Sequence, residues 1–95
     1  RRIMSFALIT TQHFERRARK FLRKHPKLRS TLRDTLDGLS QDPFQPGLKL
    51  HPLSGNLAGV QSISLTYSYR LTLMVRVTER EIVLLDIGTH DEVYG

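Results

Sequence analysis

Residues 69–77 read YRLTLMVRV, in which tyrosine, leucine or valine occupies every odd position and mostly polar residues stand between them. Because successive side chains of a strand point to opposite faces, this alternation predicts a half-buried strand with Arg70 and Arg76 on its polar side. A polar turn follows, and the apolar run Ile82–Ile87, ended by Gly88, predicts the last strand of the sheet. The two runs indicate a hairpin around which the rest of the fold is arranged.

Two shorter strands are expected before this hairpin. In residues 48–51 two leucines alternate with Lys49 and His51, so a cation and an imidazole would share one face. Pro52 indicates a sheet edge or a bulge just beyond them. Residues 63–65, with two apolar positions, indicate the second short strand.

The first half of the chain predicts one strand followed by two helices. Ile3–Ile9 is almost wholly apolar, which is typical of a strand buried on both faces, and we expect it inside the sheet. Thr10 or Thr11 can cap a helix whose apolar stripe comprises Phe14, Ala18, Phe21 and Leu22. His25-Pro26 interrupts this helix, and a second helix with regularly spaced leucines runs to Asp42-Pro43.

The expected order is therefore one strand, a two-helix hairpin and a four-stranded antiparallel meander. This order predicts an α+β fold in which the helices pack on one face of a twisted sheet and leave the other face open. With 95 residues, the chain is expected to form one domain, residues 1–95, whose site is an open face or groove.

The net charge of +6 is unevenly distributed. Residues 1–33 hold eleven Lys and Arg against one acidic residue, whereas residues 34–95 hold four against eight. Four of the cations form a ridge opposite the apolar stripe of the first helix: Arg16, Arg19, Lys20 and Arg23. A polarised basic surface favours a nucleic acid or an acidic protein as partner, the alternative being a solvated face that only confers solubility.

Some classes of protein and site are disfavoured. The chain has no cysteine, which removes disulfides and thiolate chemistry and fits a reducing cytoplasm. Its apolar runs are too short to cross a bilayer or to act as a signal peptide, so we expect a cytoplasmic protein that does not bind a membrane. The histidines lack the spacing of metal ligands, so neither a metal nor another cofactor is expected.

Five residues could carry chemistry: Lys49, His51, Arg70, His90 and Tyr94. Two imidazoles can serve as the base and the acid of one reaction near neutral pH, and two fixed cations can stabilise a phosphorane. The set is thus suited to cleavage of an RNA phosphodiester by its own 2′-hydroxyl. Each residue taken alone could equally be an ordinary surface side chain, and Tyr94 could simply cover the end of the sheet.

Two segments resemble a known family. LKLHPLSGNLAG at residues 48–59 and GTHDEVY at residues 88–94 are similar to the corresponding segments of the RelE toxin superfamily, in particular its YafQ-like branch. The resemblance implies the toxin of a type II toxin–antitoxin pair, which enters the ribosomal A site, cuts messenger RNA there and is silenced by a cognate antitoxin.

On this resemblance, His51 and His90 match the catalytic histidines, Tyr94 matches a functional aromatic position, and Arg70 matches an arginine that binds the scissile phosphate. Tyr94 would then stack on a base of the RNA or orient it. The basic helices, with Arg76, would bind ribosomal RNA. Residues 61–68 depart from the family pattern, because they lack its arginine, its further histidine and its acid. Two alternatives therefore stay open: a ParE-like toxin that inhibits gyrase without cutting RNA, and an inactive module that only binds the antitoxin.

Overall fold

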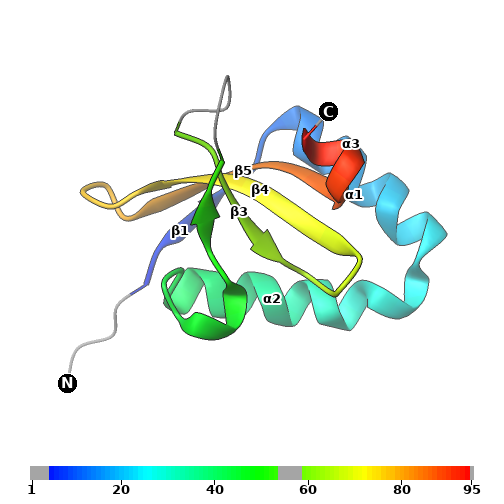
Figure 1. Cartoon of the computed structure of the whole chain (residues 1–95), viewed down its shortest axis with the longest axis horizontal. Coiled ribbons are helices and arrows are strands. Elements are labelled where there is room, and N and C mark those ends of the chain that lie inside the picture. Colours follow the sequence, from blue (N-terminus) through cyan, green and yellow to red (C-terminus); the bar gives the residue numbers. More distant parts are fainter. Residues whose placement is uncertain (1–4, 54–58, 95) are drawn as a thin grey trace.

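The computed structural model describes residues 5–53 and 59–94, so residues 3–4 of the first expected strand and residues 54–58 of the family-like segment 48–59 lie outside the described part. The elements (Figure 1) are β1 (Ala7–Ile9), α1 (Gln12–Lys24), the 3-10 helix η1 (Pro26–Leu28), α2 (Arg29–Gln41), the 3-10 helix η2 (Pro46–Leu48), β2 (His51–Pro52), β3 (Gln61–Ser64), β4 (Tyr69–Arg76), β5 (Glu81–Thr89) and α3 (His90–Tyr94). The predicted α+β order is confirmed, with an additional helix at the end.

The described strands form one sheet in the order β1-β5-β4-β3-β2, and β2 to β5 make the expected antiparallel meander. The prediction that the first strand lies inside the sheet is wrong. Among the described strands, β1 pairs with β5 alone, in parallel, and therefore forms an edge. Ala7 and Ile9 are exposed, whereas Phe6, just before the strand, is buried and hydrogen-bonded to Ser40 of α2. An apolar run alone does not distinguish a central strand from a short edge strand.

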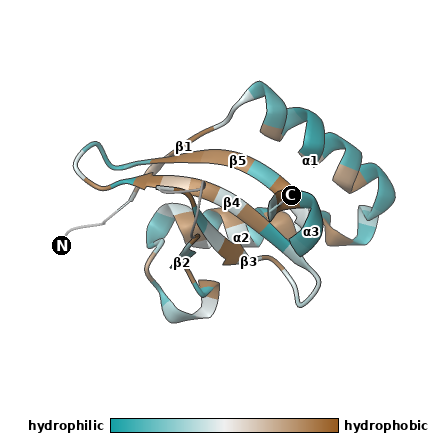
Figure 2. Cartoon of the chain, turned by 45° about the horizontal axis from the view of Figure 1, so that its top comes forward, coloured by the Kyte–Doolittle hydropathy of each residue, from teal (hydrophilic) through white to brown (hydrophobic). Residues whose placement is uncertain are grey.

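The core lies between the helices and one face of the sheet. Phe14 and Phe21 of α1 and Leu32 and Leu39 of α2 join the buried residues of β3, β4 and β5 in one cluster. Figure 1 shows α2 running along this side of the sheet, and in Figure 2 hydrophobic residues are concentrated on β5 and part of β4. The opposite face carries α3, which leaves part of that face open.

The helix boundaries follow local chemistry, as the sequence predicts. The Thr11 hydroxyl accepts a hydrogen bond from the Phe14 backbone N–H at 3.1 Å, which caps α1. α1 ends at Lys24 and η1 begins at Pro26, so the interruption at His25-Pro26 is confirmed. None of the described helices has the length and apolar character needed to cross a membrane.

Residues 48–50 do not form the predicted strand. Pro46 begins a 3-10 turn that includes Leu48, and Lys49 leaves this turn in the left-handed conformation, with φ of 57°. The strand is therefore only His51–Pro52, at the edge of the sheet. Four alternating residues are too few to outweigh the tight turn that Pro46 favours.

The two long strands also differ from expectation at their ends. β4 stops at Arg76, and Val77 is 60% exposed in the hairpin turn. β5 continues through Gly88 to Thr89. Leu85 is an extra residue in β5, because Thr72 pairs with Asp86 while Leu73 pairs with Leu84. This bulge places Ile87 in the core and turns Asp86 to the other face.

Candidate functional site

An open hollow lies beside the β3–β4 turn and has a volume of about 780 Å³. It brings together residues from η2 and β2, from β3 and β4, and from the start of α3. Its lining consists of Gly47, Lys49, His51, Ser64, Leu65, Thr66, Tyr67, Arg70 and His90. Four of the five residues that the sequence singles out for chemistry therefore share one surface, although they come from three separate stretches of chain.

His51 is held by the chain just before it. Its Nδ1 lies 2.8 Å from the backbone carbonyl oxygen of Lys49. A carbonyl oxygen can only accept a hydrogen bond, so Nδ1 must carry the proton and donate it. In the neutral ring Nε2 is then unprotonated and able to accept a proton. The left-handed backbone of Lys49 turns the chain so that the Lys49 carbonyl oxygen and the His51 ring face each other.

Arg70 is half-buried at the start of β4. Its Nη1 donates a hydrogen bond to the Ser64 hydroxyl at 3.3 Å, and the two residues are directly paired across β3 and β4. On its other side Arg70 pairs with Gly88 of β5. Both neighbouring strands fix its backbone, and its guanidinium contacts Ser64, which also lines the hollow.

His90 is the first residue of α3, and a capping box begins this helix. The Glu92 backbone N–H donates to the Thr89 hydroxyl at 3.2 Å, and the Thr89 backbone N–H donates to the Glu92 carboxylate at 2.9 Å. This second bond is the main reason why the pKa of the Glu92 carboxyl lies below its ordinary value of 4.5, and the nearby charge of Arg17 acts in the same direction. The His90 Nδ1 lies 3.5 Å from the Asp91 carboxylate.

Tyr94 is not part of the lining. Its hydroxyl donates to the Ser62 hydroxyl at 2.7 Å, and Ser62 is fully buried in β3. Its ring meets the His90 ring edge to face, with ring centres 4.1 Å apart. Tyr94 therefore ties His90 and α3 to the sheet, and its hydroxyl is already occupied within the protein.

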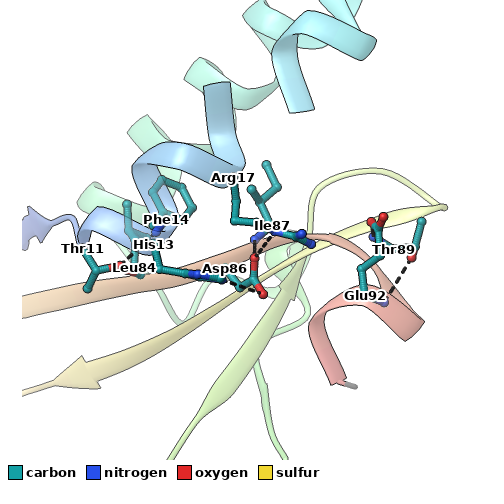
Figure 3. A network of polar contacts seen from close by, with 9 residues as sticks. All are labelled: Thr11, His13, Phe14, Arg17, Leu84, Asp86, Ile87, Thr89 and Glu92. Atoms are coloured by element: carbon teal, nitrogen blue, oxygen red, sulfur yellow. Dashed lines mark hydrogen bonds and ion pairs between the residues drawn. The ribbon is translucent and has the colours of Figure 1, made fainter. Parts of the chain in front are cut away.

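A further set of polar contacts, made by residues of α1, β5 and α3, positions α3 (Figure 3). Arg17 of α1 donates from Nε to the Asp86 carboxylate at 2.9 Å, and His13 lies 3.4 Å from the same carboxylate. Glu92 reaches back over Gly88 toward Arg17: a methyl group at Gly88 would lie 2.5 Å from the Glu92 Oε1 and 3.2 Å from the Arg17 Nη2. Absence of a side chain at Gly88 thus lets α3 dock against the sheet.

The cationic ridge of α1 lies on the surface. All four of its members are exposed: Arg16, Arg19, Lys20 and Arg23. Lys20 also lines a smaller hollow of about 270 Å³ between α1, the end of β5 and α3. Arg76 lies at the far end of β4 from Arg70 and is paired with Glu79 and Glu81, each at 3.6 Å. It lies outside the lining that Arg70 shares with the histidines.

Reasoning from the sequence missed Tyr67, whose side chain is 99% exposed at the mouth of the hollow, and Ser64, the partner of Arg70. It also missed α3 itself. For α3 the signal was available, because Thr89 followed by Glu92 at the third position is the pattern of a capping box. For Tyr67 the sequence carries no comparable signal, since a tyrosine in a turn can be either buried or exposed.

No family model and no curated protein matches the chain. Solved structures do match. A chain of the DinJ-YafQ toxin-antitoxin complex of E. coli superposes with a TM-score of 0.77 and 17% identity, covering 96% of this chain and 99% of that one. A chain of the toxin-antitoxin complex RelBE2 of Mycobacterium tuberculosis has a TM-score of 0.74 and 21% identity, covering 90% and 99%.

A YoeB/ParE toxin from Agrobacterium tumefaciens matches similarly, with a TM-score of 0.75, 20% identity and coverage of 90% and 99%. At such identities the likeness establishes a shared architecture. The chain therefore has the fold of the RelE/YafQ-like toxins.

Proposed function

We propose that this chain is the toxin of a type II toxin–antitoxin pair and acts as an endoribonuclease on messenger RNA in the ribosomal A site. The observation that carries the proposal is the meeting of His51, His90, Lys49 and Arg70 in one open hollow. The hollow is accessible to a polymer, unlike an enclosed cavity suited to a small molecule. The shared fold with YafQ and YoeB/ParE toxins supports the same reading.

The reaction needs no metal or other cofactor. Nε2 of His51 takes the proton of a ribose 2′-hydroxyl, and the resulting oxygen attacks the adjacent phosphorus. The bond from phosphorus to the 5′-oxygen breaks, and that oxygen takes a proton from His90. Arg70 and Lys49 stabilise the negative charge that gathers on the phosphorane oxygens. The products are a 2′,3′-cyclic phosphate and a 5′-hydroxyl.

The role of Tyr94 is then to position His90 through the edge-to-face contact of their rings. The cationic ridge of α1 would contact ribosomal RNA, which binds exposed cations through its phosphates. A cognate antitoxin would silence the protein in the cytoplasm. The complexes in which YafQ and RelBE2 were solved support such a partner for this chain.

The test is to map messenger RNA ends after induced expression of the wild type, His51→Ala, His90→Ala and a control, Val77→Ala. Val77 is exposed in the turn after β4 and lies outside the lining of the hollow. We expect new ends with 5′-hydroxyl groups for the wild type and Val77→Ala, and at least a hundredfold fewer for the other two. Equal cleavage by all four proteins would refute the mechanism.

The same experiment addresses the two alternatives. Growth arrest with intact messengers and DNA damage would indicate a ParE-like inhibitor of gyrase. Absence of arrest would indicate a module that only binds the antitoxin. In a separate assay with the purified protein, RNA cleavage that leaves no cyclic phosphate and stops on addition of a chelator would refute the metal-independent mechanism.

A further inference from the structure

Tyr67 is held rigidly while its side chain stays in water. The turn from Leu65 to Tyr69 is closed by two backbone hydrogen bonds, in which Leu65 and Thr66 donate to the Tyr69 carbonyl at 2.9 and 3.2 Å. The Ser68 N–H donates to the Thr66 hydroxyl at 3.2 Å. Tyr67, in the middle, is 99% exposed. The backbone is therefore fixed, and the ring has no packing partner within the described part of the chain.

An exposed tyrosine on a tight turn does not contribute to the core. The other two tyrosines do have partners: Tyr69 packs against Phe21 and His25, and Tyr94 binds Ser62 and His90. Only Tyr67 presents both faces of its ring to solvent. It does so at the mouth of the hollow that holds Arg70 and His51.

Among the described residues that line this hollow, Tyr67 is the only one with a six-membered ring. A flat aromatic face beside fixed cations matches the chemistry of a nucleotide, in which a base and a phosphate lie a few ångströms apart. Bases stack on such faces, and the phosphate interacts with the cations. Tyr67 and Arg70 line the same hollow, so we expect a single nucleotide bound there to contact both.

We propose that Tyr67 is the stacking platform for the nucleotide next to the scissile phosphate and selects unpaired RNA as substrate. The inference rests on the proposed function and specifies its substrate. A base within a duplex is already stacked and paired, so it cannot lie on the Tyr67 ring without being extruded. Every base has a flat face, so the platform is tolerant of sequence and prefers the larger purines. Tyr94, which the resemblance points to, positions His90 instead.

The experiment uses the purified full chain and a short single-stranded RNA with one 2-aminopurine and a 2′-deoxy sugar at the preceding position. The missing 2′-hydroxyl prevents cleavage, and stacking quenches the fluorescence of 2-aminopurine. We expect Tyr67→Ala to weaken binding about tenfold and to abolish the quenching. Tyr67→Phe should retain both, because stacking needs the ring and not the hydroxyl. Val77→Ala is the matched control, since Val77 is exposed at the opposite end of β4.

Two results would overturn the inference: unchanged affinity and quenching in Tyr67→Ala, or equal affinity of the wild type for the same strand in a duplex. Cleavage of the all-ribose strand, placed in the A site of purified ribosomes, separates this inference from the proposed function. If the wild type cleaves and Tyr67→Ala has the same KM and kcat, the platform fails and the nuclease stands. If nothing is cleaved but quenching depends on Tyr67, the nuclease fails and the RNA site stands.

Discussion

Gly88 offers the most direct test of how α3 is held. In Gly88→Ala the added methyl group would lie 2.5 Å from the Glu92 Oε1 and 3.1 Å from the Glu92 Cβ. The carboxylate could swing away, but the Cβ is attached to the backbone of α3, so the helix itself must shift. Gly88 has no left-handed backbone angle, and the substitution therefore tests packing alone.

The expected cost follows from what the shift disrupts. Moving Glu92 breaks its bond from the Thr89 N–H, and loss of a helix cap costs about 1 kcal/mol. Overpacking against a fixed backbone adds roughly 1–3 kcal/mol when it cannot relax, and the low end applies to a short terminal helix. We therefore expect Gly88→Ala to lower the free energy of unfolding by about 2 kcal/mol. Because His90 moves with α3, RNA cleavage should fall as well.

The assay is urea denaturation followed by circular dichroism, with amide exchange at Thr89 as a local measure. Gly47→Ala is the matched control, because a methyl group at Gly47 meets no atom within 4 Å. The double variant Gly88→Ala with Glu92→Ala should be more stable than the sum of the two single effects implies, since the clash requires the Glu92 side chain. Additive effects, or a Gly88→Ala protein as stable as the control, would refute the packing argument.

Three further predictions concern neighbouring groups. In the proposed function, Lys49→Gly and Lys49→Ala should abolish cleavage to the same degree. The glycine variant should be more stable than the alanine variant by up to about 1 kcal/mol, because glycine adopts the φ of 57° without strain. Denaturation of the two variants side by side checks this difference. Asp86→Asn should lower the free energy of unfolding by about 1–2 kcal/mol, because it removes the charge that Arg17 and His13 contact. Glu79→Gln, at an exposed ion pair, should lower it by less than about 0.5 kcal/mol in the same assay. Because the pKa of Glu92 is lowered, its carboxylate contributes fully to stability above the ordinary pKa of 4.5, and this contribution is lost as the pH falls below that value. Glu92→Gln should remove this part of the dependence of the unfolding free energy on pH. An unchanged pH dependence in the variant would contradict the prediction.

Much of the fold follows from local patterns. The alternation in residues 69–77, the Thr11 cap and the break at His25-Pro26 each depend on neighbouring residues, and the structure agrees with them. The edge position of β1 could not be predicted, because it depends on a parallel pairing with β5 more than seventy residues away. The turn at Lys49 was hidden by a chance alternation of leucines around it.

The candidate site, too, could be predicted only in part from the sequence. The residue types suited to acid–base chemistry are visible in the sequence, and so is the capping box that begins α3. Their meeting is a matter of tertiary structure, because it requires β3, β4 and β5 to align Ser64, Arg70 and Gly88 in one row. The exposure of Tyr67 could be recognised only in three dimensions.

The pairing of β1 with β5 has a consequence for synthesis of the protein. A ribosome makes β1 and α1 first, but their contacts in the sheet are supplied by residues 81–89, near the end of the described chain. Until that strand emerges, β1 has no strand to pair with, and His90, the next residue after β5, cannot reach the hollow. If the proposed function is right, a nascent chain therefore has no assembled site with which to cut the message from which it is being translated.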